Sequence, residues 1–383
     1  MTAMFVRRSA VVGAIALAVA FAPHTARPQQ GSTIPAQLTD SAFWKFVTDM
    51  SEPPGNFRSE NLLSNETGFQ WVIPALLQTP RAGKVYLGVA PEQNFTYIAA
   101  IKPSLAVIFD IRKGNLLEHL LYKALFDLSA DRAQFVSLLF SKQRPARLDS
   151  TITADSLFTA YWFVPTDTAM YTKNKAAVKD DLMNKHHIPL TAADWDDLVW
   201  VYDQFYYFGP SITYSSSGGG PGGGRGGFNS MPNYADLMVA TDGAGLNRAY
   251  LATEANWRFI KTMEAKNLII PVIGNFAGPK AIKAVGAWLK EHNAVVTAFY
   301  TSNVEQYLWQ DGIAYSYYDN VAALPLDSAS VFIRSNGGMG GRGGFGGPGG
   351  MRSPNLLCSM QQLIADNKAG KINGYQSVFY GCR

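Results

Sequence analysis

The segment from Lys84 to Arg112 constrains the fold more than any other part of the chain. Two apolar runs, 85–89 and 105–111, flank a turn and a stretch with helical character. Strands of a parallel sheet are covered on both faces, so they appear in a sequence as unbroken apolar runs. The segment therefore predicts a strand, a helix and a second, parallel strand, which is the first unit of an α/β fold.

The two strand ends of this unit predict a ligand-binding turn. Gly88 permits a tight turn, and the helix behind it offers free N–H groups to a polar ligand. Asp110 ends the second strand, where a carboxylate usually accepts hydrogen bonds from ribose hydroxyls. Ala90 and Asn94 replace the glycines of a dinucleotide-binding turn, which favours a nucleoside ligand without a pyrophosphate. The alternative is that Gly88 only shapes the turn. We expect the cofactor-binding residues to be Gly88, Glu92, Asn94, Asp110 and Arg112.

Strand-like and helix-like segments alternate through the rest of the chain. This order predicts one Rossmann-like α/β domain over residues 41–383, with a mostly parallel sheet and helices on both faces. The aromatic-rich interval 150–210 predicts a mainly helical insertion. We expect helices at 43–50, 116–140, 254–266 and 279–292, and further strands at 236–241, 268–273 and 295–300.

Two glycine-rich segments, 217–228 and 337–350, interrupt this alternation. They have almost no side chains to bury and cannot offset the entropy of ordering, which predicts flexible, disordered loops. Arginine–glycine tracts contact RNA in some proteins, but each segment has one arginine. The formal net charge of +4 is small and the basic residues form no stripe, so we expect no nucleic-acid partner.

The N-terminus has the pattern of an export signal. Arg7 and Arg8 precede an apolar run at 10–22, which is too short to span a bilayer. We expect a signal peptide at 1–26, a linker at 27–40, and a periplasmic or extracellular protein with no stable membrane insertion after cleavage. Cys358 and Cys382 are the two cysteines, and an oxidising compartment favours a disulfide between them.

Further polar residues follow other predicted strands. Because ligands of open α/β sheets gather beyond the carboxyl ends of strands, these residues are candidates for a substrate cleft, although a capping or turn role is the alternative for each. They are Glu66, Asp242, Asn275, Tyr300 and Asn303.

No standard catalytic motif is present in the sequence, so no catalytic residue is assigned. His186 and His187 stand near several acids, among them Asp180 and Asp181. These residues are expected on an exposed helix or loop, and we predict no metal site.

Four runs of sequence carry a resemblance to a known family. They are 86–99, 110–126, 275–282 and 297–308. Together they resemble a largely uncharacterised bacterial family whose fold is similar to that of S-adenosylmethionine-dependent methyltransferases. The resemblance implies S-adenosylmethionine as the cofactor, with Gly88 at the glycine turn and Asp110 as the ribose-binding acid.

Two hypotheses for function follow. The first is a methyltransferase-like enzyme that binds a small-molecule substrate beside its cofactor. The second is an exported, non-catalytic binding or scaffold protein with the same fold, because S-adenosylmethionine is made and kept in the cytoplasm. Fold resemblance does not decide between them.

Overall fold

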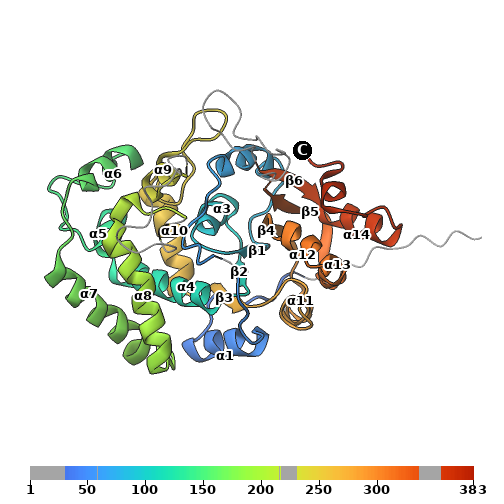
Figure 1. Cartoon of the computed structure of the whole chain (residues 1–383), viewed down its shortest axis with the longest axis horizontal. Coiled ribbons are helices and arrows are strands. Elements are labelled where there is room, and N and C mark those ends of the chain that lie inside the picture. Colours follow the sequence, from blue (N-terminus) through green and yellow to red (C-terminus); the bar gives the residue numbers. More distant parts are fainter. Residues whose placement is uncertain (1–30, 58, 215, 217–230, 336–354) are drawn as a thin grey trace, which may run out of the picture. The chain divides into compact units, whose positions relative to one another are not determined.

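The computed structural model describes residues 31–57, 59–214, 216, 231–335 and 355–383. From residue 32 onward, the described residues form one compact unit around a mostly parallel sheet (Figure 1). The described part of this sheet has six strands in the order β3-β2-β1-β4-β5-β6. Neighbouring strands are parallel except β5 and β6, which are antiparallel. The strands are β1 (Val85–Val89), β2 (Leu105–Asp110), β3 (Ile269–Ile273), β4 (Val296–Ser302), β5 (Leu326–Arg334) and β6 (Leu356–Ser359).

Helices cover both sides of the sheet (Figure 1). On one side α1 contacts β3 and α11, while α14 contacts β5 and α13; on the other, α3 contacts β1 and α4 contacts β2 and β3. The molecule therefore has a mixed α/β fold. The α-helices are α1 (Asp40–Met50), α2 (Ile73–Leu76), α3 (Gln93–Ile101), α4 (Lys113–Leu128), α5 (Arg132–Phe140), α6 (Ala154–Trp162), α7 (Thr168–Lys179), α8 (Ala192–Phe208), α9 (Tyr234–Val239), α10 (Glu254–Ala265), α11 (Ala281–Glu291), α12 (Val304–Gln310), α13 (Ala314–Ala322) and α14 (Met360–Lys368). Shorter helical segments are η1 (Phe69–Val72), the π-helical η2 (Asp180–Lys185), η3 (Gly209–Ser211) and η5 (Tyr375–Phe379).

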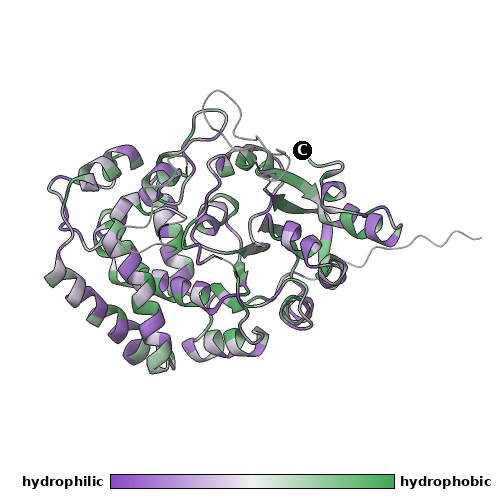
Figure 2. Cartoon of the chain, in the orientation of Figure 1, coloured by the Kyte–Doolittle hydropathy of each residue, from purple (hydrophilic) through white to green (hydrophobic). Residues whose placement is uncertain are grey.

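The apolar runs lie in the centre of the sheet. Every residue of β1, β2 and β3 is buried. Figure 2 shows hydrophobic residues concentrated in the strands and hydrophilic ones on outer helices such as α7. Burial on both faces explains why these strands are recognisable in the sequence without alternation.

The strand order creates a switch point between β1 and β4. The chain passes from β1 outward to β2 and then β3, and later returns to the other side of β1 to place β4 and β5. The connection after β1 therefore runs to one side of β1, whereas the connection after β3 crosses to its other side. In open α/β sheets a crevice forms at this point, beyond the carboxyl ends of the strands.

Two of the expected elements are wrong. Residues 236–241 were expected as a strand, but most of them belong to helix α9, which begins with a capping box between Asn233 and Asp236. The long helix expected at 116–140 is two helices, α4 and α5. The break falls before Asp131, whose side chain accepts a hydrogen bond from the Gln134 N–H and begins α5.

The chain ends are attached to the body where the structure describes them. In the interval expected as a linker, the Thr33 N–H donates to the His292 carbonyl (2.8 Å) and the Leu38 N–H to the Lys266 carbonyl (3.0 Å). The predicted disulfide between Cys358 and Cys382 is present and joins β6 to the C-terminal residues. The predicted signal peptide and both glycine-rich loops lie outside the described residues.

Candidate functional site

A cleft lies at the carboxyl ends of β1, β2, β3 and β4. Residues 89–91, 110–112 and 274–276 and several residues between 300 and 304 form its walls, together with parts of 57–66 and α12. Its volume is about 190 Å³, compared with roughly 300–1,000 Å³ for pockets that enclose drug-sized ligands. The cleft therefore suits a small ligand or one part of a larger one.

The charge of the cleft restricts its ligand. Its lining includes three carboxylates, Glu66, Asp110 and Asp311, and one basic side chain, Arg112. A net negative lining repels phosphate groups and favours a neutral or cationic ligand.

The turn between β1 and α3 is held from inside by Asn94. The Asn94 amide donates to the carbonyls of Val89 (2.9 Å), Ala90 (3.1 Å) and Pro91 (2.7 Å). Ala90 has a φ of 66°, in the left-handed region where a glycine is expected. A residue other than glycine is destabilised by about 1–2 kcal/mol in this conformation.

Gly88 lies inside β1 and does not line the cleft. A Cβ atom at this position would lie 1.9 Å from Oδ1 of Asn94. Gly88 therefore makes room for the side chain that fixes the turn, and the left-handed residue of the turn itself is Ala90.

Asp110 ends β2 at the cleft, but Arg112 binds its carboxylate. Oδ1 accepts hydrogen bonds from the Arg112 backbone N–H (2.8 Å) and Nε (3.0 Å), and Oδ2 accepts one from Nη2 (2.8 Å). The Arg112 guanidinium also contacts Glu60 (3.2 Å). A carboxylate has about four acceptor positions. Oδ2 of Asp110 therefore keeps acceptor capacity for a ligand.

Glu66 is the centre of a buried polar network beside this pair. Its carboxylate accepts hydrogen bonds from Ser302 Oγ (2.5 Å), Gln93 Nε2 (3.1 Å) and Asn355 Nδ2 (2.9 Å). Asn355 also donates to the Tyr97 hydroxyl (2.8 Å). The network thus connects the end of β4, the start of α3 and the residue before β6 at one wall of the cleft.

The other predicted residues divide into two groups. Asn275, Tyr300 and Asn303 line the cleft, as do Glu66, Asp110 and Arg112. Burial, followed by the neighbouring Glu66, raises the pKa of Tyr300 well above its ordinary value, so its hydroxyl is neutral. Gly88, Glu92, Asn94 and Asp242 are not part of the lining.

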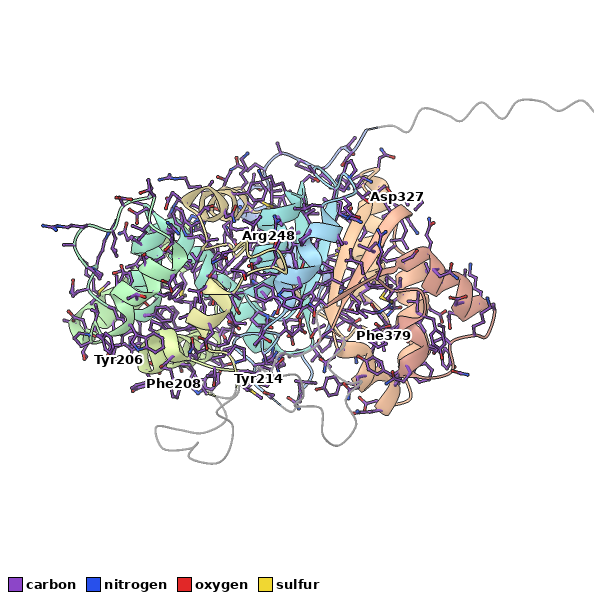
Figure 3. The ribbon with its side chains drawn as sticks, turned by 90° about the horizontal axis from the view of Figure 1, so that it is seen from above. Tyr206, Phe208, Tyr214, Arg248, Asp327 and Phe379 are labelled. Carbon is purple, nitrogen blue, oxygen red and sulfur yellow. A yellow bond between two sulfur atoms is a disulfide. The ribbon has the colours of Figure 1, made fainter. Side chains whose placement is uncertain are left out.

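Asp242 is a structural residue of the loop after α9. It pairs with Arg248 (2.5 Å) and accepts hydrogen bonds from the N–H groups of Ala244 (2.8 Å) and Leu246 (2.9 Å). Figure 3 shows Arg248 well apart from Tyr214, which lines the cleft. The prediction fails because residues 236–239 belong to helix α9, so Asp242 does not follow a strand of the sheet.

Behind the turn lie two buried acids. Glu92 is fully buried, and neither of its carboxylate oxygens has a hydrogen-bond partner of good geometry among the described residues. Burial raises its pKa to about 8, and the N–H groups of Glu92 and Ser64 offset this only in part. Burial, and then the charge of Glu92, raise the pKa of Glu118 as well.

His119 lies beside Glu118 on α4 and supports the same turn. Its Nε2 is 3.0 Å from the Ala90 carbonyl, which can only accept, so Nε2 carries the proton. Burial lowers the His119 pKa to about 4, which keeps the imidazole neutral at pH 7. A neutral donor therefore holds the strained Ala90 in place.

Glu92 should make the protein less stable as the pH rises from about 5 to about 8. Its folded pKa of about 8 lies above the unfolded value, so the folded state binds more protons in this window. The slope contributed by one such group is at most about 1.4 kcal/mol per pH unit. In urea unfolding across this pH range, the free energy of unfolding should decline less steeply for Glu92→Gln than for the parent protein. The matched control is Glu291→Gln at an exposed position; equal slopes for both variants and the parent would contradict this role of Glu92.

The cleft lies mainly within the part of the chain that matches a known family. The model described as Domain of unknown function (DUF7790) matches residues 62–206 and 227–345, more than half of the chain. The chain belongs to this family. The match includes β1 to β5 and most of the cleft, whereas Asn355 of the Glu66 network lies beyond it. A comparison with curated proteins finds no match.

Proposed function

We propose that the cleft binds an adenosyl ligand of the S-adenosylmethionine type and that the chain is a methyltransferase-like enzyme. The observation that carries this proposal is Asp110, a carboxylate at the carboxyl end of β2 that faces the cleft beside the switch point. An acid at this position is the usual partner of ribose hydroxyls in Rossmann folds. The strand order also supports this fold, whose usual order is the same, although β6 is antiparallel here.

The electrostatics of the cleft support this class of ligand over a dinucleotide. S-adenosylmethionine carries a positive sulfonium, an ammonium group and one carboxylate, so its net charge is positive, and it has no phosphate. A lining with three acids and one arginine suits such a ligand. Oδ2 of Asp110 would accept a ribose hydroxyl, Glu66 would face cationic groups, and Asn275 and Tyr300 would face the substrate.

The second candidate function is an exported, non-catalytic binding or scaffold protein. The pair of Asp110 with Arg112 favours it, because the acid already accepts three hydrogen bonds from within the protein. The disulfide at Cys358 and Cys382 supports an oxidising, exported location, where S-adenosylmethionine is scarce. None of the described helices combines the length and the apolar character needed to cross a membrane.

Thermal unfolding with S-adenosylmethionine or S-adenosylhomocysteine tests the first function. A ligand at a hundred times its Kd adds about 2.7 kcal/mol to stability, so the Tm should rise clearly. Asp110→Asn should abolish this rise, because the amide cannot replace a carboxylate that accepts on both oxygens.

Asp242→Asn is the matched control, since it weakens another acid–arginine pair outside the cleft. It should lower the starting Tm but keep the shift caused by the ligand. No shift with either ligand at millimolar concentration, in folded protein, would contradict the adenosyl proposal and favour the binding protein.

A further inference from the structure

A cluster of side chains of the types that can hold a metal ion lies away from the cleft, where α1, α4 and the π-helical η2 meet. Asp127 comes from the end of α4, Asp181 from η2, and His186 directly follows η2. One ligand atom from each lies within 4.8 Å of the others. Two parts of the chain, the end of α4 and the segment of η2, therefore direct two carboxylates and one imidazole to the same point.

The π-helical turn brings Asp181 and His186 to one face. The His186 N–H donates to the Asp181 carbonyl (3.0 Å), a hydrogen bond between residues five apart. In an α-helix, side chains five residues apart point about 140° away from each other. The wider π turn stacks them instead, and single π turns of this kind occur frequently at functional sites.

The two nitrogens of His186 face different partners. Nδ1 is 3.1 Å from Oδ1 of Asp40, a close contact without hydrogen-bond geometry, while Nε2 is 3.0 Å from Oδ2 of Asp127 and 3.8 Å from Oδ2 of Asp181. Metal-binding histidines usually have such a carboxylate on the nitrogen that does not bind the metal, which fixes the ring. Asp40 can serve in this way and leave Nε2 for an ion.

Asp181 provides a second indication of a ligand. It is 3% exposed, and its Oδ2 accepts no hydrogen bond among the described residues. A buried carboxylate oxygen without a donor is costly and is usually satisfied by a cation or water. Because Oδ2 is directed toward the His186 imidazole, a metal ion between them would satisfy it.

Lys185 is the protein's own cation at this place. Its Nζ pairs with Asp127 and with Oδ1 of Asp181 (3.0 Å). The side chain is 55% exposed, so it can move into solvent when another cation binds. An ion-pair cluster that only joins the helices is the competing explanation, and it predicts no affinity for metal.

We propose that Asp127, Asp181 and His186 bind a divalent ion of the zinc type, with Asp40 orienting His186. One imidazole and two carboxylates form a ligand set that suits Zn²⁺, whereas Ca²⁺ and Mg²⁺ prefer oxygen ligands alone. Three protein ligands leave a fourth position for water, and the ion connects α4 with η2.

Calorimetric titration of the full, untagged chain with zinc chloride after treatment with EDTA tests the proposal. The parent protein should bind one ion, and His186→Gln should lose this binding while keeping its far-UV circular dichroism. Asp40→Asn should weaken binding by about 10–100-fold, as expected for the partner of a metal-binding histidine. Lys185→Gln should bind zinc at least as tightly as the parent, because a competing cation is removed.

His292→Gln is the control, since this histidine stacks on Trp288 and lies outside the cluster. It should bind zinc as the parent does. Equal binding by His186→Gln, or no binding by both the parent and Lys185→Gln, would overturn the proposal and leave an ion-pair cluster. If His186→Gln does not fold, zinc binding by Asp40→Asn is compared with zinc binding by Lys185→Gln. A metal site predicts weaker binding in Asp40→Asn and undiminished binding in Lys185→Gln, whereas an ion-pair cluster predicts no binding in either variant.

Discussion

Replacing Glu305 with alanine should lower the free energy of unfolding by about 3–5 kcal/mol, the usual cost of removing one partner of a buried ion pair. Glu305 on α12 binds Arg334 at the end of β5 through two contacts, Nε to Oε2 (2.5 Å) and Nη2 to Oε1 (3.0 Å). Each side chain is 2% exposed. Without the carboxylate, the Arg334 guanidinium still contacts the Val378 carbonyl (3.1 Å) and the Phe332 ring (4.1 Å to its centroid). Neither group carries a charge, so the buried cation would have no anionic partner in Glu305→Ala.

Urea unfolding measures this loss, and two variants separate its causes. Asp49→Ala breaks the exposed pair with Lys45 and should cost less than about 1 kcal/mol. A double variant, Glu305→Leu with Arg334→Met, removes both charges and should recover most of the stability. A Glu305→Ala loss no larger than that of Asp49→Ala would contradict the interpretation. Because α12 lines the cleft, weaker ligand binding should accompany the loss.

The sequence predicts those parts of the fold that depend on burial alone. Strands covered on both faces are built mostly of apolar residues, so β1, β2 and β3 can be found from their nearly unbroken runs. A short run such as 237–239 is compatible with a strand or a helix, and there the capping box at Asn233 decided for the helix. The break before Asp131 likewise depends on a cap within a stretch that is apolar throughout.

The candidate site could be predicted only in part, because its chemistry depends on which polar side chains contact one another in the folded chain. The sequence predicts that Asp110 and Arg112 lie at a strand end. It does not predict that Arg112 binds the Asp110 carboxylate. Asn355 is 289 residues from Glu66 and reaches it because β6 lies antiparallel beside β5. Asp181 and His186 are recognisable as possible ligands, yet the π turn that aligns them has no clear signal in the sequence.

Replacing Gly88 with alanine should lower the free energy of unfolding by about 3 kcal/mol or more. The new Cβ would lie 1.9 Å from Oδ1 and 2.9 Å from Cγ of Asn94. Asn94 is fully buried; its amide donates to three carbonyls of the turn, and its Oδ1 accepts from the Tyr86 hydroxyl (2.8 Å). Its displacement would leave several buried polar groups without partners. Urea unfolding measures the loss, and any ligand-induced rise in Tm should fall with it because the turn forms a wall of the cleft.

A double-mutant cycle with Asn94→Ala shows whether the clash is the cause. Asn94→Ala alone should be destabilising, but adding Gly88→Ala to it should cost little more, since the group that the Cβ would strike has gone. The same loss in both backgrounds would mean that Gly88 acts through its backbone conformation instead.

Ala90→Gly is the matched comparison at the same turn. This substitution relieves the strain of a φ of 66°, which should raise the free energy of unfolding by about 1 kcal/mol. The greater conformational freedom of glycine in the unfolded chain offsets part of this increase. The two substitutions should therefore act in opposite directions: a methyl group is excluded at Gly88 by the side chain that holds the turn, whereas at Ala90 it is tolerated with strain.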